Sequence, residues 1–167
     1  MTADNTAIPH MPAEESTPWP RLGEIGLENF PPYLMNRIMG RYNAALREEL
    51  AAHGLTTAKM RTLAVLSVLD GLLIRDLSVY AVVEQSTLSR ALDALERDGL
   101  AERKTDPDDS RATRIFLTRR GRETHEELWP HVAAACAQMF DGISPEEQRA
   151  FTATLQKVLS NVRVNQF

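Results

Sequence analysis

The recurrence of apolar residues along this chain predicts that most of it is helical. Between Ser86 and Arg97 the apolar positions follow one another at helical intervals, at Leu88, Ala91, Leu92 and Leu95. This spacing is typical of an amphipathic helix that packs one face inward. The opposite face carries polar side chains, those of Gln85, Thr87, Ser89, Arg90, Asp93 and Arg97.

The patterns around this helix predict a compact motif between residues 73 and 121. A shorter helical pattern precedes it across a gap at Val82–Gln85, and two stretches with strand periodicity follow, Leu100–Thr105 and Arg114–Thr118. The segment DPDDSRAT between them, with Pro107 and three aspartates, favours a turn. Helix, turn, helix and hairpin together make a winged helix-turn-helix. Such a motif presents one helix to the DNA major groove and the hairpin to the adjacent backbone or minor groove.

The first turn of the second helix has the chemistry of a DNA-reading surface. Hydroxyl, amide and guanidinium groups bond to base edges and phosphates, and the N-terminal turn of such a helix enters the groove. The candidate recognition residues are Gln85, Ser86, Thr87, Ser89 and Arg90. The structural alternative is an ordinary amphipathic helix with a solvated polar face.

The turn between the two strands supplies a second candidate contact. Arg111 lies near its tip, where an arginine can enter a narrow minor groove of enhanced negative potential. Asp109, two residues earlier, is placed to hold that guanidinium by a charge-assisted hydrogen bond. The alternative is a soluble hairpin with a charged tip.

The stretch STLSRALDALERDGLAERKTDPDDSRATRIFLTRRG resembles the DNA-binding core of the MarR family (multiple antibiotic resistance regulators). The matching features are TLSR at the start of the recognition helix, L-E-x-x-G-L at its end, the D-P-D-D-x-R-A-T wing and the following L-T-x-x-G. A weaker resemblance extends over roughly Pro32 to Val162. The resemblance implies a homodimeric transcriptional regulator that binds a pseudo-palindromic DNA site. It places the wing motif on Asp109 and Arg111 and the groove-reading residues on Ser86, Thr87, Ser89 and Arg90.

One departure from the usual pattern concerns Val82, which stands where many helix-turn-helix proteins have glycine. A β-branched residue is strained in the left-handed conformation. We therefore expect a more open turn between the two helices.

Helical patterns also precede the motif. Tyr33–Leu50 carries a broad apolar stripe and is predicted to form one long helix. Thr56 or Thr57 is placed to cap the next helix, which Asp70–Gly71 ends. The apolar stripes of these helices are expected to close one core beneath the recognition helix.

Two further helical patterns follow the motif. The first, Arg122–Phe140, contains Pro130, which predicts a kink near Glu126–Trp129. The second begins with the capping-box sequence Ser144–Glu147, and its apolar face consists of Phe151, Leu155, Val158, Leu159 and Val162. These helices provide more apolar surface than one winged module needs, which favours a homodimer with two recognition helices about one DNA turn apart. The alternative is a monomer whose extra helices cover its own core.

The predicted fold class is mainly α with a small β-hairpin wing, a winged helix-turn-helix with N- and C-terminal dimerisation helices. We expect an acidic, proline-containing flexible arm over residues 1–30 and a dimerisation helix over residues 31–55. The DNA-binding region is expected over residues 56–120 and the C-terminal dimerisation helices over residues 121–167. These parts are expected to make one compact domain.

The net charge of −4 is unusual for a DNA-binding protein, but its distribution explains it. The first 30 residues hold five acidic side chains and one arginine, which matches the excess of the whole chain. Basic residues gather instead between residues 90 and 122, with acidic residues interspersed. The candidates for contacts to the DNA backbone are Arg97, Arg103, Lys104 and Arg114.

Other functional classes find little support in the residues. His125 and His131 do not share a helix face, so their spacing does not indicate a metal site. The sequence contains no glycine-rich phosphate loop and no nucleophile motif. We therefore expect no metal, no cofactor and no enzymatic activity. The one cysteine, Cys136, lies on an apolar stripe and is predicted to be a small core residue. No apolar run is long enough to cross a membrane and no signal peptide is evident, so we expect a cytoplasmic protein.

The resemblance implies that a small aromatic or phenolic effector could release the DNA. Met35, Met39, Tyr42, Met60 and Trp129 are the candidates to line its cleft, although such residues are also ordinary core constituents. The rival hypothesis is a protein-docking winged helix without an operator of its own, which salt-dependent DNA binding would distinguish.

Overall fold

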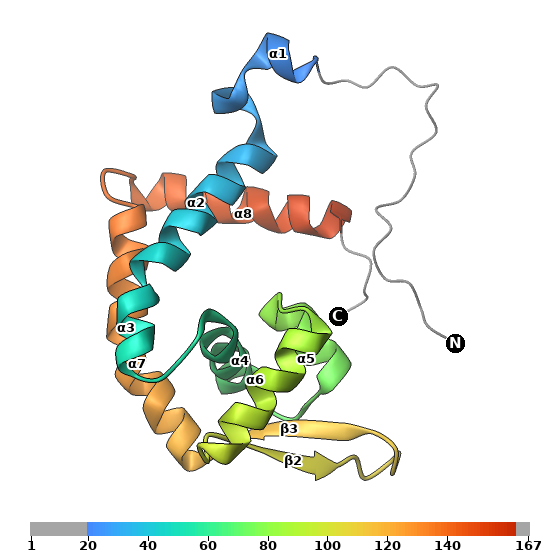
Figure 1. Cartoon of the computed structure of the whole chain (residues 1–167). Helices are drawn as coiled ribbons and strands as arrows, with labels where there is room; N and C mark the ends of the chain where they lie inside the picture. Colours follow the sequence, from blue (N-terminus) through green and yellow to red (C-terminus); the bar gives the residue numbers. More distant parts are fainter. Residues whose placement is uncertain (1–19, 163–167) are drawn as a thin grey trace, which may run out of the picture. The chain divides into compact units, whose positions relative to one another are not determined.

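The computed structural model describes residues 20–162, which form two compact units, one up to Gly40 and one from Arg41 onward. Figure 1 follows the elements in chain order. They are α1 (Leu22–Ile25), a 3-10 helix (Leu27–Asn29), α2 (Pro31–Ala45), α3 (Arg47–Ala52), α4 (Thr57–Val68), β1 (Leu72–Leu73), α5 (Ile74–Ala81), α6 (Gln85–Arg97), β2 (Ala101–Thr105), β3 (Thr113–Leu117), α7 (Arg119–Met139) and α8 (Pro145–Val162).

The N-terminal unit consists of short helices and the first part of α2. Residues 1–19 of the predicted arm lie outside the described residues, whereas residues 22–29 form α1 and the 3-10 helix. The backbone N–H of Arg21 donates to the carboxylate of Glu24, which begins α1. The expected arm therefore includes locally folded helix after residue 20.

The prediction of one continuous helix over Tyr33–Leu50 is wrong. The chain forms two helices there, α2 and α3, with a break at Leu46. Leu46 and Leu50 are both almost completely buried, at 3 and 2 % exposure. The apolar stripe keeps its phase across the break, so periodicity alone does not detect it. Thr56 begins α4, since its hydroxyl accepts a hydrogen bond from the Lys59 N–H.

One core joins all the elements of the larger unit from α3 to α7. Its fully buried side chains are Leu50, Leu63, Leu66, Leu77, Leu88, Leu92, Leu95, Ile115, Leu128 and Thr62. The predicted inward face of α6 is confirmed, because Leu88, Ala91, Leu92 and Leu95 are all buried. Burial of these four side chains holds the opposite, polar face of α6 outward.

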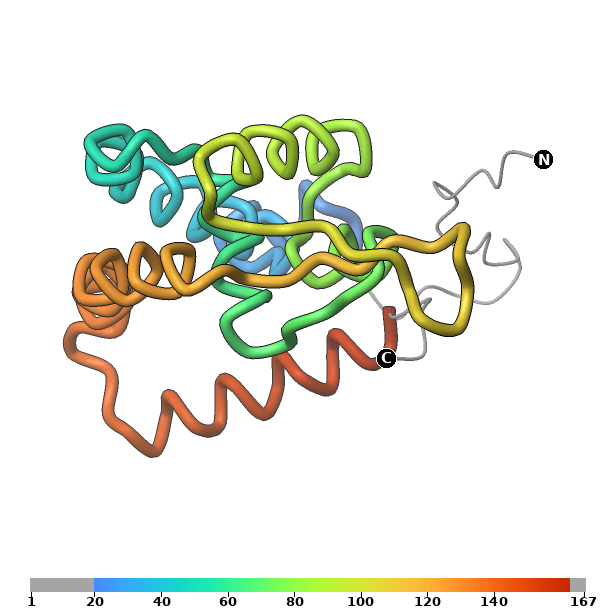
Figure 2. The backbone as a smooth tube through the Cα atoms, turned by 90° about the horizontal axis from the view of Figure 1, so that it is seen from below, coloured from blue at the N-terminus to red at the C-terminus, as the bar shows by residue number. Residues whose placement is uncertain are grey.

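The predicted hairpin is confirmed as β2 and β3, which pair antiparallel from Ala101↔Leu117 to Thr105↔Thr113. The short strand β1 adds to the other edge of β3, giving the order β1-β3-β2. A strand of two residues has no detectable periodicity, so the sequence did not predict it. In Figure 2 the hairpin extends beside the helix that precedes it, α6.

A close contact at Gly121 fixes the first turn of α7 against the sheet. Thr118 caps this helix, accepting from the Gly121 N–H and donating its own hydroxyl to the Gly99 carbonyl. A side chain at Gly121 would place its Cβ 1.9 Å from the Leu100 carbonyl oxygen, so only glycine fits.

The C-terminal helices confirm one prediction and correct another. Ser144 and Glu147 exchange the two hydrogen bonds of a capping box at the start of α8. Hydrogen bonds to the Glu147 carboxylate from the Ser144 side chain and from its backbone N–H lower the pKa of Glu147. Helix α7 continues through Pro130 without interruption, and the kink expected near Glu126–Trp129 stays a prediction. The prediction that Cys136 is a core residue is wrong, because it is exposed on this chain.

The turn between α5 and α6 is left-handed, contrary to the more open turn expected from the sequence. Val82 has φ 51° and ψ 50° and is the one non-glycine residue with positive φ among residues 20–162. The N–H of Val83 bonds to the Ser78 carbonyl and that of Val82 to the Val79 carbonyl, the hydrogen bonds that close the end of α5. Tertiary packing of the two helices on one core overrides the local preference of valine.

We predict that Val82→Gly stabilises the protein by about 1 kcal/mol, because glycine adopts this conformation without steric strain. Equilibrium denaturation by urea would measure the change. The matched control is Val79→Gly within α5, which should destabilise the protein by about 1 kcal/mol. A loss of stability in both variants would show that Val82 is not strained.

Candidate nucleic-acid interface

The N-terminal half of α6 presents an uninterrupted polar surface. Its five predicted recognition residues are all exposed: Gln85, Ser86, Thr87, Ser89 and Arg90. The Ser86 hydroxyl donates to the carboxylate of Glu84, 2.7 Å away, at the residue that precedes the helix. A carboxylate is favourable at a helix N-terminus because it faces the positive end of the dipole. The other four side chains have no polar partner within residues 20–162.

The other end of α6 is tied to the wing by Arg103. Its guanidinium on β2 donates to the carboxylate of Glu96 and, at 2.8 Å, to that of Asp93. Its backbone N–H also donates to Glu96, at 3.2 Å. Since both acidic residues lie on α6, these bonds fix the helix and the hairpin relative to each other.

The base of the wing turn is organised by Asp106, whose side chain is buried. One carboxylate oxygen accepts from the N–H groups of Asp108 and Asp109, at 2.8 and 3.1 Å. The other accepts from Arg114 Nε at 2.5 Å, and Arg114 Nη1 continues to the Gly71 carbonyl at 2.9 Å. The hydrogen bond from the Asp108 N–H, followed by that from Asp109 and by Arg114, lowers the pKa of Asp106 against the opposing effect of burial.

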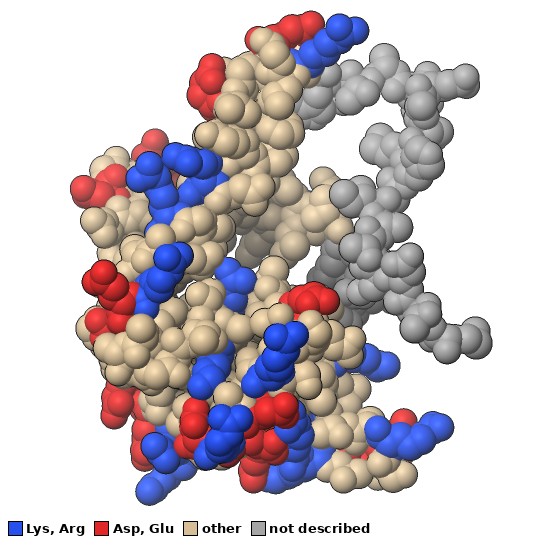
Figure 3. All heavy atoms as spheres, viewed as in Figure 1, with Lys and Arg blue, Asp and Glu red and all other residues tan. Residues whose placement is uncertain are grey.

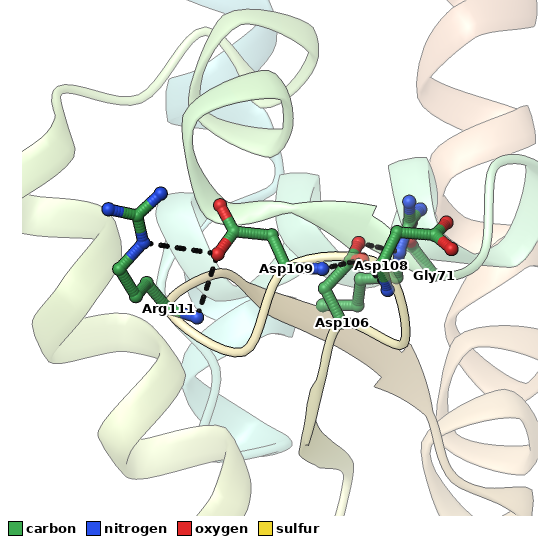
Figure 4. Close-up of polar contacts among 6 residues, drawn as sticks. Gly71, Asp106, Asp108, Asp109 and Arg111 are labelled. Atoms are coloured by element: carbon green, nitrogen blue, oxygen red, sulfur yellow. Dashed lines mark hydrogen bonds and ion pairs between the residues drawn. The ribbon is translucent and has the colours of Figure 1, made fainter.

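The predicted pairing of Arg111 with Asp109 is confirmed and is visible in Figure 4. Asp109 Oδ1 accepts from the backbone N–H of Arg111 at 3.0 Å and from its Nε at 3.3 Å. The Arg111 side chain is still 90 % exposed. The pair therefore orients the guanidinium at the wing tip while leaving its Nη groups available to a ligand.

The four predicted backbone-contact residues differ in how far they are engaged within the chain. Arg97 is exposed and forms no ion pair within the described part of the chain. Lys104 bonds to Glu102 at 2.7 Å and lies 4.8 Å from the centre of the Phe116 ring. The guanidinium groups of Arg103 and Arg114 are both committed to carboxylates. Of these four, only Arg97 combines exposure with a guanidinium that has no partner among residues 20–162.

Arg75, the second residue of α5, also lies near the wing and was not among the predicted site residues. It is 78 % exposed and pairs with its neighbour Asp76 at 3.3 Å. Arg75 and Arg111 border one hollow of 250 Å³, whose other lining residues are Leu73, Ile74, Ala112 and Thr113. The signal available in the sequence was a basic residue at the start of the first helix of the motif.

The surface around α6 and the hairpin carries both signs of charge. Figure 3 shows blue and red side chains intermixed over this lower part of the molecule. The ion pairs Arg103–Glu96 and Arg114–Asp106 account for part of the mixture. The positive charge left for a ligand is concentrated on a few unpaired arginines rather than spread over a uniformly basic face.

The five predicted cleft residues lie in different surroundings. Met60 is buried in the core, Trp129 is exposed beside the His125 ring, and Tyr42 is half-buried. Burial raises the pKa of Tyr42, Cys136 adds to the rise and Arg61 opposes it. Met35 and Met39 belong to the N-terminal unit, so a shared cleft stays a prediction.

Three further findings concern residues outside this surface. Within residues 20–162 no group of His, Cys, Asp and Glu side chains has the arrangement of a metal site. Glu49 lies between His53 and His131, with N···O distances of 3.5 and 3.2 Å, and joins α3 to α7. None of the described helices is both long enough and apolar enough to span a lipid bilayer.

The comparisons with known proteins point to one family. A family model described as "MarR family" matches residues 53–112. The crystal structure of a MarR-family transcriptional regulator from Silicibacter pomeroyi is 57 % identical, covers 89 % of this chain and 100 % of its own, and superposes with a TM-score of 0.84.

Two other similar structures are of regulators studied with DNA or with a small molecule. A complex of S. aureus MepR with DNA is 27 % identical, covers 79 % of this chain and 98 % of its own, and has a TM-score of 0.68. Bordetella bronchiseptica BpsR, described with the regulation of its DNA binding by 6-hydroxynicotinic acid, is 25 % identical, with coverages of 76 and 96 % and a TM-score of 0.68.

The lowered pKa of Asp106 gives a testable pH dependence. A carboxylate with a lowered folded-state pKa stabilises the wing above its unfolded pKa, and that stabilisation is lost as the pH falls through the folded pKa. We predict that Asp106→Asn accelerates amide exchange at Asp108 and Asp109 severalfold at about pH 7, and that the difference from wild type shrinks as the pH falls below about 4.

Hydrogen exchange followed by NMR would measure this effect. Asp108→Asn is the matched control, because the Asp108 carboxylate is exposed and forms no ion pair among the described residues. Equal exchange in wild type and Asp106→Asn at neutral pH would contradict the role given to the carboxylate.

Proposed function

This chain belongs to the MarR family of transcriptional regulators, and from that membership we propose that it is an operator-binding homodimer that acts as a repressor. One observation carries the proposal. The exposed polar half of α6 lies next to a hairpin whose tip presents a pre-oriented, exposed arginine. That pair of elements fits a major groove and the minor groove beside it.

We assign base reading to the first turns of α6. Arg90 can form two hydrogen bonds with a guanine edge, while Gln85 and Ser89 suit adenine or mixed contacts. The Ser86 hydroxyl donates to Glu84, which limits it to an acceptor role or to a contact made after that bond opens. Arg111 is assigned to the minor groove.

The remaining arginines divide into two roles under this proposal. Arg97 and Arg75 contact phosphates, since both are exposed and Arg75 shares a hollow with Arg111. Arg103 and Arg114 instead hold the wing in place, because their guanidinium groups are bound to carboxylates and would have to break those pairs to meet DNA. Lys104 is intermediate, with a short ion pair on an exposed strand.

The homodimer is supported by apolar faces that the single chain leaves uncovered. Neither α2 nor α8 contains a buried residue, although both carry apolar stripes. On α8 the exposed apolar side chains are Phe151, Val158, Leu159 and Val162. Contiguous exposed apolar surface on a helix marks an interaction site, and a two-fold axis would place two recognition helices for one pseudo-palindrome.

We further propose an aromatic, phenolic or carboxylated effector that weakens DNA binding. Support comes from the half-buried Tyr42 and from BpsR, whose DNA binding is described as regulated by 6-hydroxynicotinic acid. An effector acts only through its different affinities for the DNA-competent and DNA-incompetent arrangements.

We propose repression rather than activation for a simple reason. Occupation of a promoter by the dimer is sufficient for repression, whereas activation needs an additional contact with the polymerase.

The first prediction for this function concerns specificity. Arg90→Ala should reduce the affinity ratio between the cognate site and scrambled DNA about tenfold or more, because a two-bond contact to one base is lost. Arg111→Ala should weaken binding most at sites with a narrow, A·T-rich minor groove. Fluorescence anisotropy with sites selected from genomic fragments would measure both effects.

Arg149→Ala on α8 is the control for these variants, because it removes a guanidinium whose one ion-pair partner among residues 20–162 is its neighbour Glu146. Its affinity for DNA should equal that of wild type. Wild-type protein that ignores every duplex at low salt would contradict operator binding and favour the protein-docking alternative.

The second prediction concerns the assembly. Leu159→Glu should shift the protein from dimer to monomer at micromolar concentration, since Leu159 is 63 % exposed on the single chain but buried in the proposed interface. Asn161→Glu introduces the same side chain about 200° away on the helix and should leave the dimer intact. Sedimentation velocity would measure both, and a wild-type monomer would contradict the interface.

A further inference from the structure

We propose that Arg61 is a positioning residue for the recognition helix, which it holds through the carbonyl of the strained Val82 turn. The inference rests on the proposed DNA-binding function only for its effect on affinity. The contact itself belongs to the free protein. Arg61 therefore extends the DNA-binding machinery to a residue on α4, outside the recognition helix and the wing.

The guanidinium of Arg61 joins three elements of the larger unit. It projects from α4, and Nη1 donates to the Val82 carbonyl at 3.2 Å. Its Nη2 donates to Asn43 Oδ1, on the final turns of α2, at 3.3 Å. Arg61 is half-buried. Its bond to Asn43 is partly buried, whereas its bond to the Val82 carbonyl lies at the surface.

The Val82 carbonyl is an unusual place for such a bond. Val82 adopts a conformation that valine disfavours, and its own side chain is 75 % exposed, so apolar packing does little to keep it there. Its backbone is held by the helix-ending hydrogen bonds to α5 and by Arg61. Because α6 begins three residues later, at Gln85, the dihedral angles of Val82 determine the direction in which the recognition helix leaves the turn.

Asn43 connects this turn to the end of α2. Its neighbour Tyr42 packs against the core, and Arg61 lies close enough to act electrostatically on the Tyr42 hydroxyl. A displacement of this part of α2 would draw Arg61 away from Val82 or press it closer. The Asn43–Arg61–Val82 series is thus a physical route by which a change near Tyr42 reaches the recognition helix.

A direct contact between Arg61 and a DNA phosphate is the competing explanation for any loss of affinity. The two differ in salt dependence. Removal of a phosphate contact lowers the slope of log affinity against log salt by about one, whereas loss of a positioning bond leaves the slope unchanged.

The test is a double-mutant cycle of Arg61→Met and Val82→Gly in the full chain. Arg61→Met keeps the length of the apolar stem but removes the donors. In the wild-type background it should weaken operator binding about fivefold to tenfold with an unchanged salt slope. In the Val82→Gly background, where the turn needs no restraint, the same substitution should change affinity less than about twofold.

A second measurement tests the contact without DNA. Amide exchange at Val83 should accelerate in Arg61→Met and return toward the wild-type rate when Val82→Gly is added. Asn43→Ala should produce a smaller acceleration that disappears in the Arg61→Met background. If Arg61→Met is unfolded, Arg61→Gln, which retains a shorter neutral donor, takes its place in the cycle.

Three results would overturn the inference. These are an equal loss of affinity in both backgrounds, a salt slope lowered by about one, and Val83 exchange that does not respond to Arg61. Failure of the proposed function gives a different result, since wild-type protein would then bind no duplex while the exchange data still decide whether Arg61 restrains the turn.

Discussion

The interaction on which this structure depends is the burial of one face of α6. Leu88, Ala91, Leu92 and Leu95 pack into a core formed by α3, α4, α5, β3 and α7. Their burial fixes the rotation of the helix about its axis, which in turn determines that Gln85, Thr87, Ser89 and Arg90 face solvent. The exposed polar face of α6 is thus a consequence of core packing, and a change in that packing would rotate it.

The arginines whose ion pairs hold the wing in place differ from those that we propose to contact DNA. Arg103 joins the wing to α6, and Arg114 joins the wing turn to Gly71 through Asp106. Arg90, Arg97 and the Nη groups of Arg111 are left for a polyanion. This division leaves unpaired positive charge on the proposed DNA-binding face of a chain whose net charge is −4.

The turn at Val82, shortly before the start of α6, carries local backbone strain. Arg61 holds the carbonyl of this residue from α4 and bonds to α2 through Asn43. A strained turn held by two helix-ending backbone bonds and by one side chain can respond to small displacements elsewhere, because the hydrogen bonds that hold it are few.

The sequence by itself determined the elements whose patterns are local. The spacing of leucines in α6, the D-P-D-D-x-R-A-T turn and the Ser144–Glu147 capping box predicted the helix, the hairpin with its Asp109–Arg111 pair and the start of α8. Only the tertiary structure decided the break at Leu46, the left-handed Val82, the exposure of Cys136 and the partners of Arg61, Arg103 and Arg114. The reason is physical: periodicity and turn chemistry act between near neighbours in the chain. Strain and ion pairing depend instead on which distant segments the core brings together.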